Sequence, residues 1–234
     1  GIIGRLTSWL LGKSGKNTLL LEQHRIDQAK GSSRGKSRMF GEAHARDIYF
    51  RLARQSRYLW RDLELETGEK LLHLCGGLDI SASADSRSDI KKIASTLRSR
   101  RLSFEIFNGV ALCRRYPQWR CSPGISAIYS DQVCILDAER CMNAVLRTAK
   151  KHGVIIRDQS RVVSVDTNGS SKTILVKISS GKIYRTQKLI ITAGPWAQNI
   201  LMRLGVRLPL QVSQEQTVYF APRRNVGLFT PKNI

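Results

Sequence analysis

Residues 1–23 read GIIGRLTSWLLGKSGKNTLLLEQ, and this stretch decides the fold. It opens with Gly1 and Gly4 and continues with apolar residues at helical spacing. That spacing predicts a helix that closes near Gly12 or Gly15. Glycines at the start of a helix let a ligand or another backbone approach its first turn closely.

The second half of this stretch predicts a strand and an acid. Leu19–Leu21 is a short apolar run of the kind found in buried strands, and Glu22 follows it directly. In dinucleotide-binding sheets, glycines admit the pyrophosphate to a helix N-terminus, and an acid at the end of the next strand accepts from the ribose hydroxyls. Only a G-x-x-G is present here, so the pattern alone is equally consistent with a turn glycine and a capping glycine.

Length and charge set further bounds. The 234 residues are 41% apolar, enough for one large domain or two small ones, and no run of 18 apolar residues predicts a membrane span. The 39 Lys and Arg exceed the 18 Asp and Glu, a net charge of +21 that favours anionic partners such as nucleic acid, an acidic membrane surface or a phosphorylated cofactor. Because the basic residues are dispersed, with 98–101 the densest run, a solvated surface is the favoured interpretation.

The cysteines and histidines do not indicate a metal site. Four histidines stand at no ligand spacing, and the five cysteines form no C-x-x-C pair. We therefore expect no metal, and reduced, partly buried thiols of an intracellular protein, at Cys75, Cys113, Cys121, Cys134 and Cys141.

The rest of the chain alternates helical and strand patterns. Residues 25–44 are polar and aperiodic and predict a long loop. Helices are expected at 43–66, with Ile48, Leu52, Leu59 and Leu63 on the apolar face, at 88–102, and at 137–153. Strands are expected at 72–81, in an antiparallel meander at 162–165, 174–178 and 183–191 with turns at 167–171 and 179–182, and at 208–220.

Five stretches occur in an order and at intervals that resemble one family. They are the opening GIIG…TLLLEQ, GSSRGKSRMF (31–40), the segment 129–153, KLIITAGPWAQNIL (188–201) and RLPLQVSQEQTVYF (207–220). Together they resemble the monomeric sarcosine oxidase and pipecolate oxidase family, part of the D-amino-acid-oxidase-like FAD oxidoreductases, over essentially the whole chain. In that family Gly1 and Gly4 would be the second and third fingerprint glycines. We therefore expect a fragment that lacks the first strand and the C-terminal part.

The resemblance implies an α/β fold. It predicts an FAD-binding Rossmann-like domain of the glutathione-reductase type, with an antiparallel meander and the beginning of an antiparallel substrate domain. The segments expected are the first part of the FAD domain (1–80), a substrate-domain segment (81–135), the second part of the FAD domain with the meander (136–205), and a truncated substrate-domain sheet (206–234).

The resemblance also implies the site. The residues expected to contact FAD are Gly1, Ile2, Ile3, Gly4, Glu22, Gln23, Ser32, Ser33, Ser37, Arg38, Met39, Val162, Thr192, Ala193, Gly194 and Trp196. Arg38 would lie beside the flavin ring as the catalytic residue. The chain departs from the family at Arg34, where a histidine is usual, and at Gly41, where the family has an arginine that holds the substrate carboxylate.

The implied reaction is oxidation of the C–N bond of a secondary or N-methylated amino acid by FAD and O2, giving an imine and H2O2. The protein would be a monomer in the peroxisome or cytoplasm, acting on a small amine or amino acid. One alternative is an amine dehydrogenase that passes electrons to a carrier. Gly41 and Arg34 suggest another, a flavin-binding pseudoenzyme. Residues 114–120 interleave basic and aromatic side chains, which leaves nucleic-acid binding as the least favoured alternative.

Overall fold

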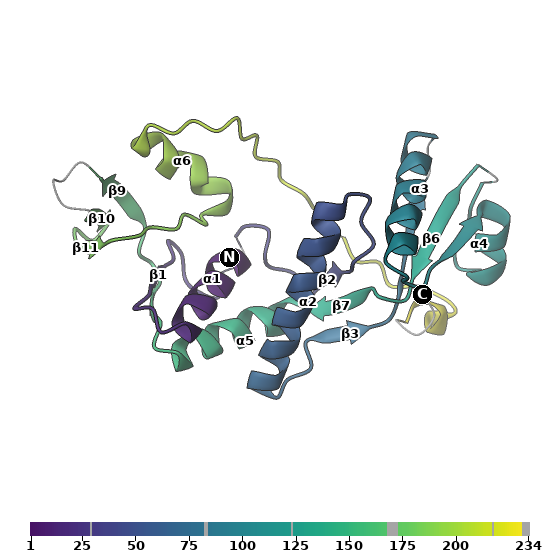
Figure 1. Ribbon diagram of the computed structural model, residues 1–234, viewed down its shortest axis with the longest axis horizontal. Helices are drawn as coiled ribbons and strands as arrows, with labels where there is room; N and C mark the ends of the chain where they lie inside the picture. The colour runs from purple at the N-terminus through teal and green to yellow at the C-terminus, as the bar shows by residue number, and fades with distance from the viewer. Residues whose placement is uncertain (29, 82–83, 123, 168–172, 217, 231–234) are drawn as a thin grey trace. The chain divides into compact units, whose positions relative to one another are not determined.

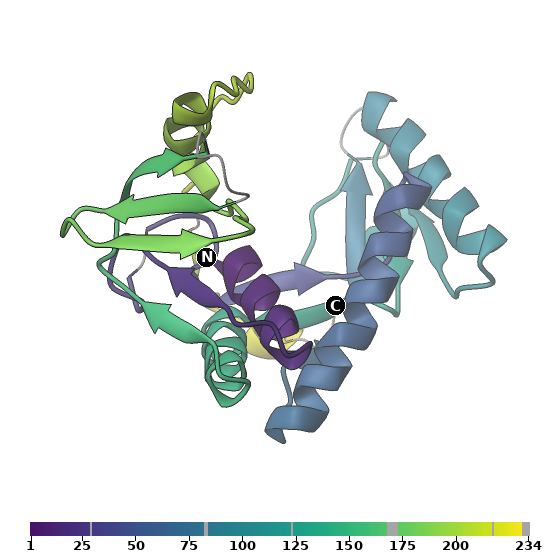
Figure 2. The same cartoon turned by 60° about the vertical axis from the view of Figure 1, so that its left-hand side comes forward.

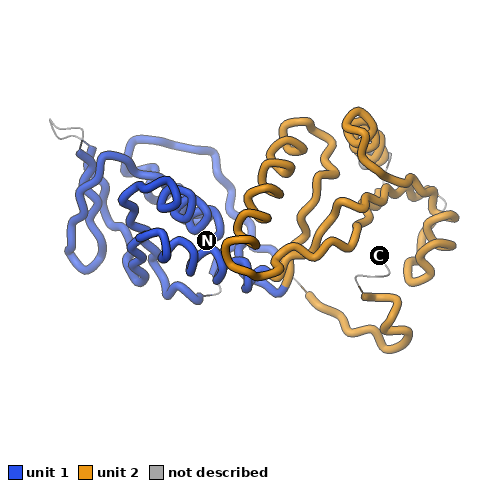
Figure 3. Tube along the Cα trace, turned by 60° about the horizontal axis from the view of Figure 1, so that its bottom comes forward, with its two compact units in different colours: residues 1–36, 138–216 blue, residues 37–137, 217–234 orange. Residues whose placement is uncertain are grey.

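The computed structural model describes residues 1–28, 30–81, 84–122, 124–167, 173–216 and 218–230. The chain divides into two compact units (Figure 3). Unit 1 comprises Gly1–Lys36 and Ala138–Gln216, and unit 2 comprises Ser37–Asp137 and Thr217–Ile234. Each unit is built from two separate stretches of sequence, so tertiary contacts define the units and local sequence does not. The assignment of segments to FAD and substrate domains stays a prediction.

Unit 1 contains a helix pair, a parallel strand pair and a small antiparallel sheet. Its elements are α1 (Ile2–Lys13), β1 (Leu19–Leu21), α5 (Ala138–Lys151), β8 (Ile155–Arg157), β9 (Val162–Asp166), β10 (Ile174–Ile178), β11 (Ile183–Thr186), α6 (Ala197–Leu201) and the 3-10 turns η1 (Gly194–Trp196) and η2 (Met202–Leu204). The predicted helices at the N-terminus and at 137–153 and the strand at 19–21 are confirmed.

The core of unit 1 lies where α1 packs against α5 (Figure 1). Trp9 of α1 and Val145 of α5 are almost completely buried. The two segments approach closely at Gly12, where a Cβ would lie 2.7 Å from Cγ2 of Val154. Beside the helices, β1 pairs in parallel with β8, with Leu19 opposite Ile155. The strand pair thus carries the chain to Glu22 at the start of the loop that follows.

The predicted meander is confirmed as a three-stranded antiparallel sheet in the order β11-β10-β9 (Figure 2). Gly181, with φ +86°, makes the turn between β10 and β11. One boundary is wrong, because β11 ends at Thr186 and residues 187–191 form no strand. The predicted 167–171 turn lies outside the described residues from position 168 onward.

Unit 2 contains two antiparallel sheets and three helices among its described residues. Its elements are β2 (Ser37–Phe40), α2 (Asp47–Thr67), β3 (Leu72–Leu74), β4 (Gly77–Ser81), α3 (Ala84–Ser99), β5 (Glu105–Asn108), α4 (Gly109–Arg115), β6 (Ser126–Ser130), β7 (Cys134–Asp137) and the 3-10 turn η3 (Val226–Phe229). One sheet has the order β2-β7-β3 and the other β4-β6-β5. In α3, the apolar residues Ile90, Ile93 and Leu97 are buried and pack with Ile128 of β6.

Two strand predictions in unit 2 need correction. The expected loop at 25–44 contains β2, because Ser37–Phe40 pairs along β7, a partner about 100 residues away that no local pattern announces. The expected strand at 72–81 is two strands, β3 and β4, which belong to different sheets. Gly76, with φ +75°, makes the break between them.

The apolar face predicted for α2 is wrong in three of its four positions. Leu63 is fully buried, but Ile48, Leu52 and Leu59 are 39–51% exposed. The buried stripe runs instead through Phe50, Ala53, Arg57 and Leu63. The rotation of the helix follows from Arg57, which forms an ion pair with the buried Glu42 at 2.5 Å. Gly68 closes the helix in the left-handed conformation.

The strand predicted at 208–220 is not formed in residues 208–216 or 218–220, and Thr217 lies outside the described residues. Leu208, Leu210 and Val212 are 43–60% exposed. A strand needs a hydrogen-bonded neighbour, and no strand of the described residues pairs with this segment. Among the described residues, no helix has the length and apolar character needed to cross a membrane.

Candidate nucleotide-binding site

The first turn of α1 brings two predicted site residues against distant parts of unit 1. The amide of Ile2 donates to the hydroxyl of Ser33 at 3.0 Å. A Cβ on Gly4 would lie 2.7 Å from Oγ1 of Thr192, so no larger residue fits there without movement. The first turn contains no acidic side chain. The amides of a helix N-terminus lack intrahelical partners and attract anions, so this turn is suited to a negatively charged group.

Glu22 lies beside the same turn. Its Oε2 is 3.7 Å from the Gly1 amino group, and its Oε1 accepts from the amide of His24 at 3.1 Å. Backbone bonds of Glu22 to Arg157 (2.9 Å) and to Ser160 (2.8 Å) continue the pairing beyond β1 and hold the residue in place. The carboxylate is therefore a positioned acceptor at the N-terminus of α1.

The loop after β1 contacts the first turn of α1 through Ser33. Within it, Gly31 has φ +87°, and a Cβ there would lie 3.7 Å from the ring of Trp196. Arg34 forms an ion pair with Glu139 at 3.4 Å, and its Nε donates to the carbonyl of Gln28 at 2.9 Å. Arg34, where the chain departs from the family pattern, therefore has its bonding partners inside unit 1.

The prediction that residues 192–196 follow the end of a strand is wrong, because 187–193 form no strand and Gly194–Trp196 is a 3-10 turn. The stretch still reaches α1 through Thr192. Trp196 meets His24 edge to face, with ring centroids 5.5 Å apart. Nε2 of His24 is buried without a hydrogen-bond partner. An unpartnered buried polar atom beside this cluster is available to a ligand.

Sequence reasoning missed Arg5. Its side chain is 6% exposed, and its guanidinium donates to the carbonyls of Met142 (2.9 Å) and Ile26 (2.5 Å). Burial lowers the pKa of Arg5, and the charge of Arg34 adds to that effect. Arg5 thus ties α1 to α5 and to the loop after β1, a positioning role. In the sequence, the feature that could have indicated its burial is its position on the same helical stripe as Trp9 and Gly12.

The remaining predicted residues of unit 1 stay predictions as FAD contacts. Ile3 is 62% exposed, and Gln23 is half-buried beside Glu22 in sequence. Val162 lies in β9, opposite Ile178 of β10. Ser32 and Gly194 are exposed, and Ala193 is half-buried.

Ser37, Arg38 and Met39 belong to unit 2, on β2. The guanidinium of Arg38 is exposed and donates to the carbonyl of Ser37 at 2.7 Å. Met39 is 70% exposed. Gly41 follows the strand, and a Cβ there would lie 3.0 Å from Cγ2 of Val133.

The chain belongs to the family of FAD dependent oxidoreductases, whose model matches residues 1–232. The enzymes of this family use FAD, and the mixed α/β fold described above is theirs. The predicted family and cofactor are therefore confirmed.

Two curated relatives are similar to this chain over most of its length. The chain is 30% identical over 220 residues to a human protein named peroxisomal sarcosine oxidase, covering 94% of this chain and 55% of that protein. It is 25% identical to a monomeric sarcosine oxidase of a Bacillus strain, covering 94% and 56%. The chain spans about half the length of the curated relatives it matches.

Solved structures share the fold. The structure matches the open form of NikD, described as an unusual amino acid oxidase essential for nikkomycin biosynthesis, with a TM-score of 0.79, 22% identity, and coverage of 89% of this chain and 53% of NikD. It matches glycine oxidase from Geobacillus kaustophilus with a TM-score of 0.74, 18% identity, and coverage of 89% and 57%.

Proposed function

We propose that the complete protein is an FAD-dependent oxidase of a secondary or N-methylated amino acid, similar to sarcosine. The observation that carries this proposal is the cluster around the first turn of α1. Gly4 lies against Thr192, Ser33 accepts from Ile2, and Glu22 lies beside Gly1. This cluster occurs in a chain that belongs to the FAD-dependent family.

The residues of unit 1 fit the dinucleotide part of FAD. The N-terminus of α1 and the hydroxyl of Ser33 offer hydrogen bonds and partial positive charge for a pyrophosphate. The glycines at positions 1 and 4 add no side chain at two positions of the helix start. Glu22 offers an ionised acceptor for the ribose hydroxyls, which are hydrogen-bond donors.

When bound, FAD supplies the redox chemistry, accepting a hydride from the carbon beside the substrate nitrogen. The protein's part is to bind, orient and provide charge. Arg38 carries a permanent positive charge, which would favour negative charge on a neighbouring flavin ring. We propose O2 as the acceptor, with an imine and H2O2 as products.

Substrate binding is where this chain departs from its relatives. Without an arginine at position 41, a substrate carboxylate loses a bidentate partner. Arg34, a possible replacement, already bonds Glu139 and the carbonyl of Gln28. We propose that the protein binds small N-methyl amino acids weakly or prefers an amine without a carboxylate.

We further propose a monomer and an intracellular site, peroxisomal or cytoplasmic. The names of the human and mouse relatives, peroxisomal sarcosine oxidase, support the first location.

The test uses the complete protein purified with FAD. Anaerobic addition of sarcosine, pipecolate, proline or a simple N-methylamine should bleach the flavin absorbance for at least one compound. Readmission of air should then restore the colour and release H2O2, detected with a peroxidase-coupled dye. Bleaching without peroxide in air would identify a dehydrogenase, and no bleaching with any amine would contradict the proposal.

A further inference from the structure

Two thiols outside the candidate site lie against each other in unit 2. Cys113 stands in α4, and Cys121 lies in the loop that follows. The amide of Cys121 donates to Sγ of Cys113 at 3.1 Å, and the Cys113 thiol donates to the carbonyl of Trp119 at 3.2 Å. Both cysteines are free and partly exposed. Solvent reaches the pair, and the chain already folds back to bring its members together.

The sulfur of Cys113 lies against the backbone of Cys121. The amide nitrogen of Cys121 is 3.1 Å from the Cys113 sulfur, and an N–Cα bond is about 1.5 Å long, so the Cα of Cys121 lies within about 4.6 Å of that sulfur. An approach of one sulfur to the backbone of the other cysteine is a precondition for a disulfide, whose two Cα atoms lie about 4.4–6.8 Å apart. A rotation of the partly exposed Cys121 side chain is the movement required. The turn between Cys113 and Cys121 is held by a hydrogen bond of 3.0 Å from the Trp119 amide to the Tyr116 carbonyl.

We propose that Cys113 and Cys121 are an oxidation site that closes to a disulfide when the protein meets a hydroperoxide. In the first step the sulfur of Cys113 attacks the O–O bond of H2O2, becomes a sulfenic acid and releases water. In the second step the sulfur of Cys121 attacks the sulfenic sulfur, the S–S bond forms, and the hydroxyl leaves with the thiol proton as a second water. Peroxide is the oxidant, and two thiols are oxidised by one H2O2.

The order of the two steps follows from the environments. Burial and a hydrogen bond with Cys113 raise the pKa of the Cys121 thiol. Cys113 is held in place by two hydrogen bonds, from the Cys121 amide and to the Trp119 carbonyl, whereas closing the S–S bond requires the Cys121 side chain to rotate. This assigns the first step to Cys113 and the second to Cys121.

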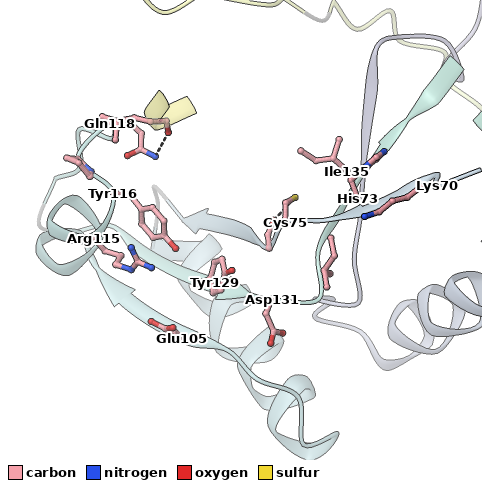
Figure 4. A pocket seen from close by; sticks show the side chains of 14 residues that line it. Lys70, His73, Cys75, Glu105, Arg115, Tyr116, Gln118, Tyr129, Asp131 and Ile135 are labelled. Carbon is pink, nitrogen blue, oxygen red and sulfur yellow. Dashed lines mark hydrogen bonds between the residues drawn. The ribbon is translucent and has the colours of Figure 1, made fainter. Parts of the chain in front are cut away.

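The disulfide would constrain one wall of a cavity of about 1110 Å³ in unit 2. The loop between the two cysteines contributes Tyr116, Pro117 and Gln118 to its lining, and Figure 4 shows Tyr116 and Gln118 on one side of the cavity and His73 on another. The side-chain Nε2 of Gln118 also donates to the carbonyl of Leu228 at 3.1 Å. Closing the loop reduces the freedom of this wall. The pair needs only peroxide, whether it comes from the reaction proposed above or from outside.

The test adds peroxide to the purified holoprotein, blocks the remaining thiols with an alkylating agent and digests with trypsin. Cleavage after Arg114 and Arg120 puts the two cysteines on separate peptides, and a disulfide keeps them joined until a reductant is added. Because the second peptide runs to Arg140 and also contains Cys134, Cys121→Ser is needed to assign the link. That variant should lose the linked peptide and trap a sulfenic acid at Cys113, detectable with dimedone.

Cys75 provides the matched control, since it is also partly exposed. Cys75→Ser should form the 113–121 link as the unsubstituted protein does. We expect free thiol to disappear at Cys113 and Cys121 at least about tenfold faster than at Cys75, Cys134 or Cys141. Equal rates at all cysteines, a preferred link between Cys75 and Cys134, or oxidation of Cys113 past sulfenic acid without a link would overturn the proposal. Because peroxide is added, these results do not depend on whether the protein is an amine oxidase.

Discussion

At the scale of single residues, Glu22 is the polar group most firmly positioned in the candidate site. Its backbone is bonded to Arg157 and Ser160, and its Oε1 accepts from the amide of His24. If the carboxylate binds the ribose, Glu22→Ala removes a charged hydrogen bond worth about 1.5–3 kcal/mol and should weaken FAD binding about tenfold or more. Flavin fluorescence titration of the apoprotein measures this.

The control for Glu22 is Asp27→Ala, an acid in the following loop that pairs with Arg25 and is exposed. It should leave the FAD dissociation constant unchanged. Equal dissociation constants for Glu22→Ala and the unsubstituted protein would remove Glu22 from the site.

Gly4 and Thr192 give a second residue-scale prediction. Since a Cβ on Gly4 would lie 2.7 Å from Oγ1 of Thr192, Gly4→Ala should destabilise unit 1 by about 1–3 kcal/mol. Adding Thr192→Ala removes the colliding oxygen and should recover part of that loss. Gly124→Ala, with open space around its Cβ, is the control. Urea unfolding of these three variants, of Thr192→Ala alone and of the unsubstituted protein measures the coupling, and strictly additive effects would contradict this contact.

Substitution of Gly41 tests the proposed substrate preference. Gly41→Arg should restore a carboxylate partner, but its Cβ would lie 3.0 Å from Cγ2 of Val133. The structure therefore favours Gly41→Arg combined with Val133→Ala, with Val133→Ala alone as control. We expect the Michaelis constant for sarcosine or pipecolate to fall, up to about a hundredfold. If the protein already binds these acids tightly and the double variant changes nothing, the proposed substrate preference is wrong.

At the scale of elements, α2 is positioned by one buried ion pair. Glu42 is 4% and Arg57 7% exposed, and Arg57 also donates to the carbonyl of Gln132 at 2.5 Å. Glu42→Ala leaves the buried charge of Arg57 without its partner and should lower the free energy of unfolding by about 3–5 kcal/mol. Asp47→Ala, which breaks only exposed pairs, should cost less than about 1 kcal/mol. Similar losses in the two variants, measured by denaturant unfolding, would contradict the assignment.

At the scale of the whole molecule, the 234-residue chain leaves much apolar surface open. Phe220 is 88% and Leu65 84% exposed, and the described parallel sheet has only two strands. Two-stranded sheets are marginally stable by themselves. We therefore predict that this chain expressed alone retains little FAD. A yellow preparation with one flavin per chain, judged from the absorbance ratio after gel filtration, would refute this.

The amino-acid sequence by itself determined the elements whose pattern is local. The helical periods predicted at the N-terminus, at 88–102 and at 137–153, the meander turn predicted at 179–182 and the family motifs all lie within short windows. Hydrophobic periodicity and turn residues act over such windows, so they could be read directly.

Only the tertiary structure decided which of these residues meet. It placed Thr192 against Gly4 and buried Arg5, and it turned α2 on the Arg57–Glu42 pair so that the predicted face at Ile48 and Leu52 is half exposed. It also made β2 a strand, through its pairing with β7. The physical reason is the same in each case. A strand needs a hydrogen-bonded neighbour and a buried charge needs its partner, and these lie 100 residues apart for Ser37 and Asp137 and 15 residues apart for Arg57 and Glu42.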